Sequence, residues 1–292
     1  MLSVNPYIRV TKIFDSNMYM LNCSTNASIC REIGKTYLEL LHEVNSGIGV
    51  EKEKIEKKYS RSLIDDLLKE GTLMETNSPQ YNCNILKKCN HKYPLTGVVI
   101  EVTNACNLNC IHCYGQFGRP KACRIWTLAE VKDIKRKLDE LHTMEVRLSG
   151  GECFLNSDFE EIALFFLNNG FRVGIYSNGS LPDALEKFLK KTKKYNFYVA
   201  ISLDGIGNMH NRMRGRDCYN EVSRSLNILK MYDNVEVLIE TAVSKMNVSN
   251  VVDDRELVKK EYPKFEHKSF FISPTESKEN SFSGLEIKNL PS

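Results

Sequence analysis

The sequence has little net charge and no long apolar run. Among its 292 residues, 40 lysines and arginines nearly balance 37 aspartates and glutamates, so the formal net charge is only +3. That balance gives no strong general attraction to nucleic acid or to anionic membranes. No apolar stretch approaches the roughly 18–20 residues of a transmembrane helix, and residues 1–6 lack the basic, then apolar pattern of a signal peptide. We therefore expect a cytoplasmic protein that binds neither nucleic acid nor membrane.

Cysteine, in contrast, is abundant, with ten residues. Because the cytoplasm keeps thiols reduced, we expect ligands, catalytic groups or core thiols rather than disulfides. Cys106, Cys110 and Cys113 form a C-x3-C-x2-C motif directly after the apolar run 98–102, which predicts a buried strand. Thiolates on one loop can face a common centre, and they select zinc or iron–sulfur clusters. A structural zinc site needs four ligands, whereas three cysteines leave one iron of a four-iron cluster open.

This loop, followed by the aromatic Tyr114, resembles the cluster loop of the radical S-adenosylmethionine (SAM) enzymes. The resemblance implies a [4Fe–4S] cluster that Cys106, Cys110 and Cys113 hold as metal ligands and as the catalytic centre. In that family the open iron binds SAM, which the reduced cluster cleaves to a 5′-deoxyadenosyl radical. His112 is expected to face solvent, because three thiolates already suffice. A structural metal knuckle or ordinary thiols are the alternative interpretation of the motif.

From residue 97 the chain alternates strands with helices, which predicts an α/β fold with a parallel sheet. The expected strands are 98–102, 145–149, 172–176, 197–201, 235–243 and 268–272, and the expected helices are 127–141, 158–168, 182–192, 219–231 and 248–260. The βα units over 97–273 resemble the partial (βα)6 barrel of the radical SAM family. In barrels of parallel strands, active sites lie at the carboxyl ends of the strands.

Chemically distinctive residues directly follow four of these strands. They are the cysteine loop, Gly150-Gly151-Glu152, Ser177-Asn178 and Ser202-Leu203-Asp204. Gly150 and Gly151 have no Cβ, so the backbone can closely approach a ligand. By resemblance, the Gly-Gly-Glu segment binds the amino group of SAM, with the negative charge of Glu152 beside it. Ser177 and Asn178 offer groups for the ribose hydroxyls or the methionine end of SAM.

Further roles rest on the Ser-Leu-Asp-Gly…His…Arg pattern. In family members with this pattern, the residues matching Ser202 and Arg214 bind the SAM carboxylate, and a guanidinium suits a carboxylate. Asp204 and His210 fit the same pattern, and each could equally be a structural hydrogen-bond partner. Tyr114 is expected to lie near the adenine.

The first 75 residues predict a small α+β domain that resembles a winged helix. Its expected strands are 7–14, 18–22 and 72–74, and its expected helices are 37–44, 51–58 and 62–70. The pattern resembles the peptide-recognition domain of ribosomal-peptide modifying enzymes, which captures the leader of a precursor peptide as an added strand. A DNA-binding winged helix needs a basic recognition helix, whereas helix 62–70 is net acidic. A simple packing appendage is the other alternative.

Residues 76–96 are polar and irregular, which predicts a linker, and Cys83 and Cys89 within it are expected to be free thiols. Residues 274–292 form a polar tail that we expect to be disordered. The Ser-Leu-Asp-Gly pattern is similar to that of radical SAM enzymes that modify peptides, which commonly continue into an extension with auxiliary clusters. Here the last cysteine is Cys218. One cluster is therefore expected, in either a minimal enzyme or a truncated product.

The predicted function is thus a radical SAM enzyme that modifies a ribosomally made peptide. Its expected partners are a precursor peptide bound by residues 1–75 and an electron donor such as a reductase, flavodoxin or ferredoxin. A radical SAM enzyme for a small metabolite and an inactive peptide-binding protein are the alternatives. Cys123, Cys153 and Cys218 have no assigned role, although packing is favoured for Cys153 over a thiyl-forming or hydrogen-donating role.

Overall fold

The computed structural model describes residues 1–13, 16–86, 95–118 and 122–272. Its buried apolar side chains form two separate clusters, one in the N-terminal module and one in the sheet domain that follows. No helix in these ranges combines the length and the apolar character needed to cross a bilayer. The predicted tail 274–292 and most of the second half of the predicted linker lie outside the described residues.

The N-terminal module contains two small sheets and three helices. The strands are β1 (Leu2–Val4), β2 (Ile8–Lys12), β3 (Tyr19–Cys23), β4 (Arg31–Ile33) and β5 (Leu73–Glu75), and the helices are α1 (Lys35–Val44), α2 (Lys52–Glu56) and α3 (Arg61–Glu70). Strands β2, β3 and β4 form one antiparallel sheet, and β1 pairs with β5 in the other. The three helices and the strands β2, β3 and β5 were predicted. Strands β1 and β4 have three residues each, too few for a periodic pattern.

Helix α3 shows why the helical predictions succeed. The Ser60 hydroxyl accepts a hydrogen bond from the Leu63 N–H at the first turn, and Gly71 ends the helix with a φ of +86°. Ile64 and Leu67 are buried against the module's core. The serine cap, the terminal glycine and the apolar stripe of this helix are therefore all local features of the sequence.

The module extends beyond the predicted boundary at residue 75. The Val10 N–H donates to the Asn84 carbonyl (3.0 Å), and the Leu86 N–H donates to the Val10 carbonyl (3.4 Å). Ile85 is buried in the module's core, and the Asn82 side chain is buried as well. Residues 82–86 thus pack along β2 as part of the module and are not a linker. A short polar segment with one isoleucine gave no periodic signal.

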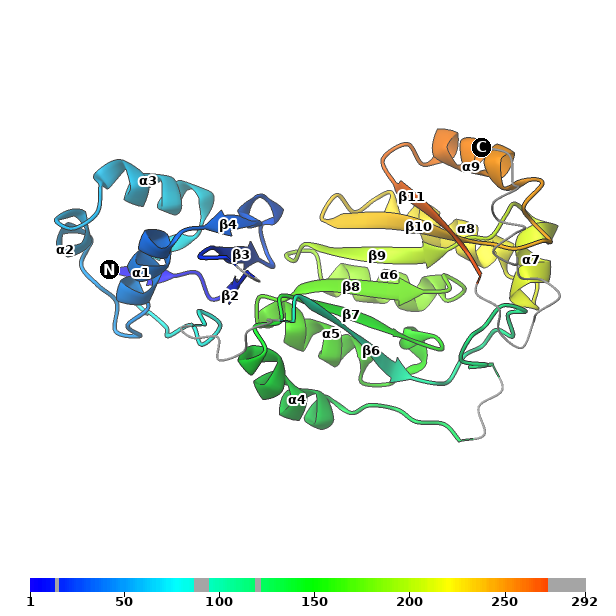
Figure 1. Ribbon diagram of the computed structural model, residues 1–292, viewed down its shortest axis with the longest axis horizontal. Coiled ribbons are helices and arrows are strands. Elements are labelled where there is room, and N and C mark those ends of the chain that lie inside the picture. Colours follow the sequence, from blue (N-terminus) through cyan, green and yellow to red (C-terminus); the bar gives the residue numbers. More distant parts are fainter. Residues whose placement is uncertain (14–15, 87–94, 119–121, 273–292) are drawn as a thin grey trace.

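The second domain is a six-stranded parallel sheet whose successive strands are connected by helices along the chain (Figure 1). Its elements are β6 (Gly97–Thr103), α4 (Leu128–Glu140), β7 (Glu145–Gly150), α5 (Phe159–Asn168), β8 (Arg172–Ser177), α6 (Pro182–Lys191), β9 (Phe197–Ser202), α7 (Asn208–Arg214), α8 (Tyr219–Leu229), β10 (Val235–Val243), α9 (Val251–Glu261) and β11 (Glu266–Phe271). The strands lie in the order β11-β10-β9-β8-β7-β6. The predicted α/β class and partial barrel are confirmed, and α7 is the helix that was not predicted.

The two faces of the sheet differ because side chains alternate along each strand. On β7, Val146 and Leu148 are buried in the core shared with the helices, whereas Arg147 is exposed. The opposite, polar face lines a cavity of about 920 Å³, whose walls include Arg147, Glu240 and Lys268. The inside of this partial barrel is therefore hollow and charged.

The module is attached to the end of the sheet where the strands begin (Figure 1). The fully buried Arg9 of β2 donates through Nε to the Thr143 carbonyl (2.9 Å) and through Nη2 to Asp139 Oδ1 (2.8 Å). Its guanidinium carbon lies 3.7 Å from the ring centroid of Phe171. Because residues 143 and 171 immediately precede β7 and β8, this contact holds the module opposite the carboxyl ends of the strands.

We expect Arg9→Ala to lower the free energy of unfolding by about 3 kcal/mol, because it breaks a buried ion pair and leaves donors and acceptors at the interface unmatched. Arg61→Ala is the matched control: its side chain is 78% exposed, so its effect should stay within about 0.5 kcal/mol. Chemical denaturation of both variants measures the difference. Equal stability of the two variants would contradict an Arg9-dependent interface.

Candidate functional site

The carboxyl ends of β6, β7, β8 and β9 bring together the segments that the sequence singled out. The cysteine loop follows β6, Gly150–Glu152 ends β7, Ser177-Asn178 ends β8 and Ser202–Asp204 ends β9. Since these four strands are neighbours and parallel, the segments lie along one edge of the sheet. We call this edge the rim.

The cysteine loop is held in place by α7. The Asn109 N–H donates to the Arg214 carbonyl (3.3 Å), and the Ile111 N–H donates to the Met213 carbonyl (3.1 Å). Helix α7 ends at Gly215 with a φ of +69°, where a Cβ would lie 2.4 Å from the Asn109 carbonyl oxygen. Glycine is therefore required on both conformational and steric grounds. The loop and α7 are about one hundred residues apart in sequence, so the pairing could not be predicted.

Gly151 lets two strand ends approach each other closely. A Cβ on this residue would lie 2.1 Å from the Ala105 carbonyl oxygen and 2.9 Å from Cys106 Cβ. The adjacent Glu152 N–H donates to the same Ala105 carbonyl (2.8 Å). The Gly-Gly pair thus allows β7 to pack directly against the start of the cysteine loop.

Two of the three thiols, those of Cys106 and Cys110, accept hydrogen bonds that suit thiolate ligands. Cys106 Sγ accepts from the Leu108 N–H (3.4 Å) and from Asn178 Nδ2 (3.8 Å), and Cys110 Sγ accepts from Arg214 Nη1 (3.7 Å). Desolvation by burial nevertheless raises the pKa of Cys106 to about 11. A bound iron would favour the thiolate form of Cys106 together with these donors.

The thiol donors of the cysteine loop suit a four-iron cluster. No group of three or more His, Cys, Asp or Glu side chains within residues 1–13, 16–86, 95–118 and 122–272 is placed to hold one metal ion. In a four-iron cluster the cysteines bind different iron atoms, so their sulfurs need not meet around one point. The donor set and the hydrogen bonds to sulfur therefore fit an iron–sulfur cluster.

Glu152 connects the ends of β7 and β8. Its Oε1 accepts from the Ser177 hydroxyl (2.9 Å), and its Oε2 accepts from the Asn178 N–H (2.8 Å). Burial raises the pKa of this carboxyl group, against the effect of these donors. The side chain has no exposed surface. Its predicted contact with the amino group of SAM therefore stays a prediction.

Asn178 joins the same strand end to the cysteine loop. Besides its contact with Cys106, its Nδ2 donates to Asn107 Oδ1 (3.0 Å), and Asn107 Nδ2 donates to the Ser180 hydroxyl (2.9 Å). Asn107 and Ser180 were not predicted as site residues. Asparagine within a cysteine motif gives no specific signal, because the side chain also commonly serves turns.

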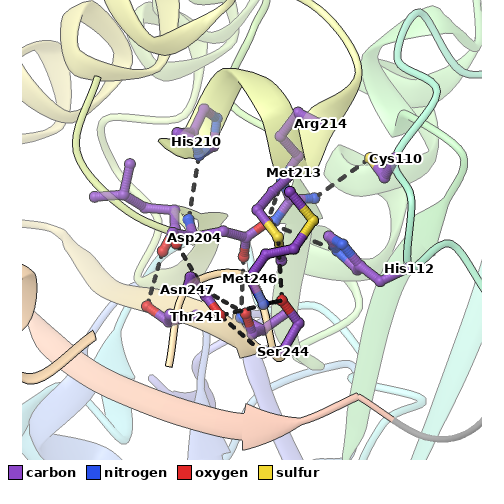
Figure 2. A network of polar contacts seen from close by, with 12 residues as sticks. Cys110, His112, Asp204, His210, Met213, Arg214, Thr241, Ser244, Met246 and Asn247 are labelled. Carbon is purple, nitrogen blue, oxygen red and sulfur yellow. Dashed lines mark hydrogen bonds and ion pairs between the residues drawn. The ribbon is translucent and has the colours of Figure 1, made fainter. Parts of the chain in front are cut away.

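Asp204 is the centre of a buried polar network (Figure 2). Its Oδ1 accepts from the Ala242 N–H (3.0 Å), and its Oδ2 lies 2.8 Å from Arg214 Nε. Its own N–H donates to His210 Nδ1 (3.1 Å). These contacts favour a structural role for Asp204 and His210. Both residues connect the end of β9 to α7, and Asp204 also contacts β10.

His112 also belongs to this network. Its side chain is only 12% exposed, and its Nε2 lies 3.7 Å from Asp204 Oδ2. The prediction that His112 faces solvent is therefore wrong, because a buried carboxylate from a distant strand end lies beside it. Burial lowers the pKa of His112, and that of His210, to about 4 in each case, so both rings are neutral at pH 7.

Asn247 is a network residue that the sequence did not reveal. Its Nδ2 donates to the carbonyls of Asp204 (2.8 Å) and Ala242 (2.9 Å), and its Oδ1 accepts from the Ser244 N–H (2.7 Å). The buried side chain thereby ties the turn after β10 to the end of β9 (Figure 2). The only signal was a polar residue shortly after a strand.

Two further predicted residues lie at the rim with open surface. Tyr114 is 70% exposed, its hydroxyl donates to Glu101 Oε1 (2.6 Å), and its ring packs edge-on against Phe117. Ser202 is half-buried at the end of β9, level with Glu240 of β10. Their roles in binding SAM stay predictions.

The other cysteines that the sequence analysis named are dispersed. Cys153 is fully buried in the core of the sheet domain, which agrees with packing, and Cys218 is buried next to the start of α8. Cys123 and Cys83 are exposed. Cys89 lies outside the described residues.

A family model described as "Radical SAM superfamily" matches residues 100–257, more than half of the chain. The chain belongs to the radical SAM superfamily. The predicted family is thereby confirmed, and membership implies a [4Fe–4S] cluster and SAM as cofactors. The matched range includes the cysteine loop and the other rim segments.

Curated relatives include an Fe-coproporphyrin III synthase of Methanosarcina barkeri, 28% identical over 60% of this chain and 43% of its own length. The sporulation killing factor maturation protein SkfB of Bacillus subtilis is 29% identical over 53% of this chain and 37% of its own length. The chain thus spans less than half of these relatives. Among solved structures, Streptococcus suis SuiB bound to its precursor peptide SuiA shares the fold over 94% of this chain and 64% of its own, with a TM-score of 0.64 and 15% identity.

We expect Glu152→Ala to lower the free energy of unfolding by about 2–4 kcal/mol, since the Ser177 hydroxyl and the Asn178 N–H lose a buried acceptor. Iron uptake should fall as well, because the β8 end that carries Asn178 loses its support. Glu140→Ala, at an exposed position on α4, should change stability by no more than about 0.5 kcal/mol. A Glu152 variant with unchanged stability and iron content would show that this connection is dispensable.

Proposed function

We propose that this protein modifies a ribosomally made peptide by radical SAM chemistry. The observation that carries the proposal is the set of three thiols on the rim, with N–H donors directed at two of them, in a chain of this superfamily. The peptide substrate is supported by the names of relatives, a maturation protein and a structure that contains a precursor peptide. The fold similarity to SuiB extends over 94% of the chain, so it includes the N-terminal module.

Cys106, Cys110 and Cys113 would each supply one thiolate to the cluster. When bound and reduced by one electron from a donor, the cluster would supply the chemistry that cleaves SAM and starts radical modification of the substrate. Gly150 and Gly151 would place backbone groups close to SAM. The other contacts with SAM would come from Tyr114, Ser177, Asn178 and Ser202. These predicted residues have polar groups at the rim.

The remaining task of the chain is to position the peptide. The module is anchored where the strands begin, and the rim lies where they end (Figure 1). Strand β7 has six residues, so this separation is about 20 Å or more at roughly 3.3 Å per residue. A leader held by the module would therefore need a spacer of at least about six extended residues before the modified position. The charged cavity inside the barrel offers a path for that spacer.

A second candidate is a radical SAM enzyme that acts on a small metabolite. The observation in its favour is the 28% identity to an Fe-coproporphyrin III synthase, which is nearly the same as the 29% identity to SkfB. The N-terminal module distinguishes the two proposals, because a small metabolite needs no leader-binding domain. In either case the cluster would need an electron donor such as a flavodoxin, a ferredoxin or a reductase.

The cluster is tested first without any substrate. After anaerobic reconstitution and reduction with SAM present, the wild-type protein should bind about four irons and form 5′-deoxyadenosine. Cys110→Ala should lose most of the iron and the product, because two thiolates hold the cluster poorly. Cys123→Ala, an exposed cysteine ten residues after Cys113, is the matched control and should behave as wild type. Full activity in Cys110→Ala would overturn the ligand assignment.

The peptide is tested with a precursor encoded beside the gene. The wild-type protein should bind it and change its mass in the presence of SAM and reductant. Cys110→Ala should bind the peptide with wild-type affinity but leave its mass unchanged, because the module lies at the opposite end of the barrel from the cysteines. Binding and mass are read by fluorescence anisotropy and mass spectrometry. A wild-type protein that cleaves SAM but neither binds the peptide nor changes its mass would favour the small-metabolite candidate.

A further inference from the structure

Glu240 differs from the other acidic side chains that line the charged cavity of the barrel. Five acidic side chains lie in its wall. Four of them form ion pairs with basic side chains of the same wall, namely Glu145 with Arg147, Asp233 with Lys264, Glu236 with Arg172 and Glu266 with Lys268. Within the part of the chain that the structure describes, the half-buried carboxylate of Glu240 has neither a hydrogen bond nor an ion pair.

The charges around Glu240 do not neutralise it. Burial raises the pKa of its carboxyl group, although the positive charges of Lys268, Arg147 and Arg214 oppose this effect. Each of these three cations already forms an ion pair with another carboxylate, which for Arg214 is Asp204 at 2.8 Å. The cations and their own carboxylates together carry no net charge. One unmatched negative charge, that of Glu240, therefore remains at this level of the barrel.

The fifth basic residue of the cavity wall, Lys230, is too far away to supply the missing charge. Its Nζ lies 4.4 Å from the ring centroid of Tyr262. Lys230 precedes β10, which begins at Val235, and Glu240 comes five residues later on that strand. Five residues of extended strand span about 17 Å. Lys230 and Glu240 therefore belong to opposite ends of the cavity.

Glu240 lies at the end of the cavity that is next to the rim. The strand register places it between Ser202 of β9 and Lys268 of β11. Its carbonyl accepts from the Leu203 N–H (2.9 Å), in the segment that directly follows β9. Because Ser202 is one of the residues predicted to bind SAM, a group held by Glu240 would lie close to the reacting atoms.

We propose that Glu240 binds a basic side chain of the substrate, a lysine or an arginine next to the position that is modified. The inference rests on the proposed function, because it assumes a peptide substrate. A half-buried carboxylate without a partner gains most from a cationic donor, since charge-assisted hydrogen bonds are roughly twice as strong as neutral ones. Glu240 is thus a specificity-determining residue: a peptide with a neutral side chain at this place leaves the carboxylate unmatched.

The test is a double-mutant cycle between the protein and the precursor peptide encoded beside the gene. In Glu240→Gln, kcat/KM for modification of this peptide should fall about tenfold, the usual effect of losing a hydrogen bond to a charged group. In the wild-type protein, replacing the matching lysine or arginine of the peptide by glutamine should cause the same loss. That peptide should lose nothing further with Glu240→Gln, because the two changes remove one interaction.

Glu236→Gln is the matched control, the same change on the same face of β10. Glu236 is 69% exposed and pairs with Arg172, so this variant should modify the precursor peptide as the wild type does. Without peptide, Glu240→Gln should form 5′-deoxyadenosine at the wild-type rate. A tenfold loss in that reaction would overturn the proposal, because Glu240 would then act on SAM and not on the peptide.

Two other results would overturn the proposal. One is an unchanged kcat/KM in Glu240→Gln, and the other is a modified peptide with no lysine or arginine within about three residues, or 10 Å, of the modified position. Should Glu240→Gln fail to fold, the peptide variants decide: an unchanged kcat/KM of the wild-type protein for every lysine and arginine replacement would contradict the inference. A wild-type protein that cleaves SAM but leaves the peptide unmodified would instead contradict the proposed function, so the two failures are distinguishable.

Discussion

Burial of negative charge at the ends of the parallel strands is the constraint on which this structure depends. Glu152 and Asp204 lie at the rim with almost no contact with water, beside the half-buried cysteine thiols. Each requires donors, because an unmatched buried anion costs several kcal/mol. The chain supplies them from neighbouring strand ends and from α7, so the same hydrogen bonds that satisfy these anions also fix the position of the cysteine loop.

The molecule separates two tasks along the strand direction. At one end Arg9 holds the module to the loops that precede β7 and β8. At the other end the cysteine loop, β8 and α7 form the rim. Between them lies the hollow, charged face of the sheet. Attachment at one end leaves the rim accessible to the cofactor, and it gives the proposed function a defined distance between peptide capture and chemistry.

The sequence revealed what depends on local pattern. Six parallel strands, the capping box at Thr127 and the distinctive segments after four strands were all predictable, since periodicity and caps are local. Short strands such as β1, the seven-residue helix α7 and the packing of residues 82–86 on β2 were not, because tertiary contacts decide them. His112 illustrates the same limit: its burial depends on Asp204, nearly one hundred residues later.

Arg214 shows how a residue identified from a sequence pattern also serves the fold. The spacing from Ser202 identified it, and an arginine suits a carboxylate in general. In the structure the carboxylate it faces is Asp204, and the sulfur of Cys110 lies on its other side. A residue whose carbonyl holds the cysteine loop, and whose guanidinium faces both a buried carboxylate and a thiol, therefore connects the fold directly to the site.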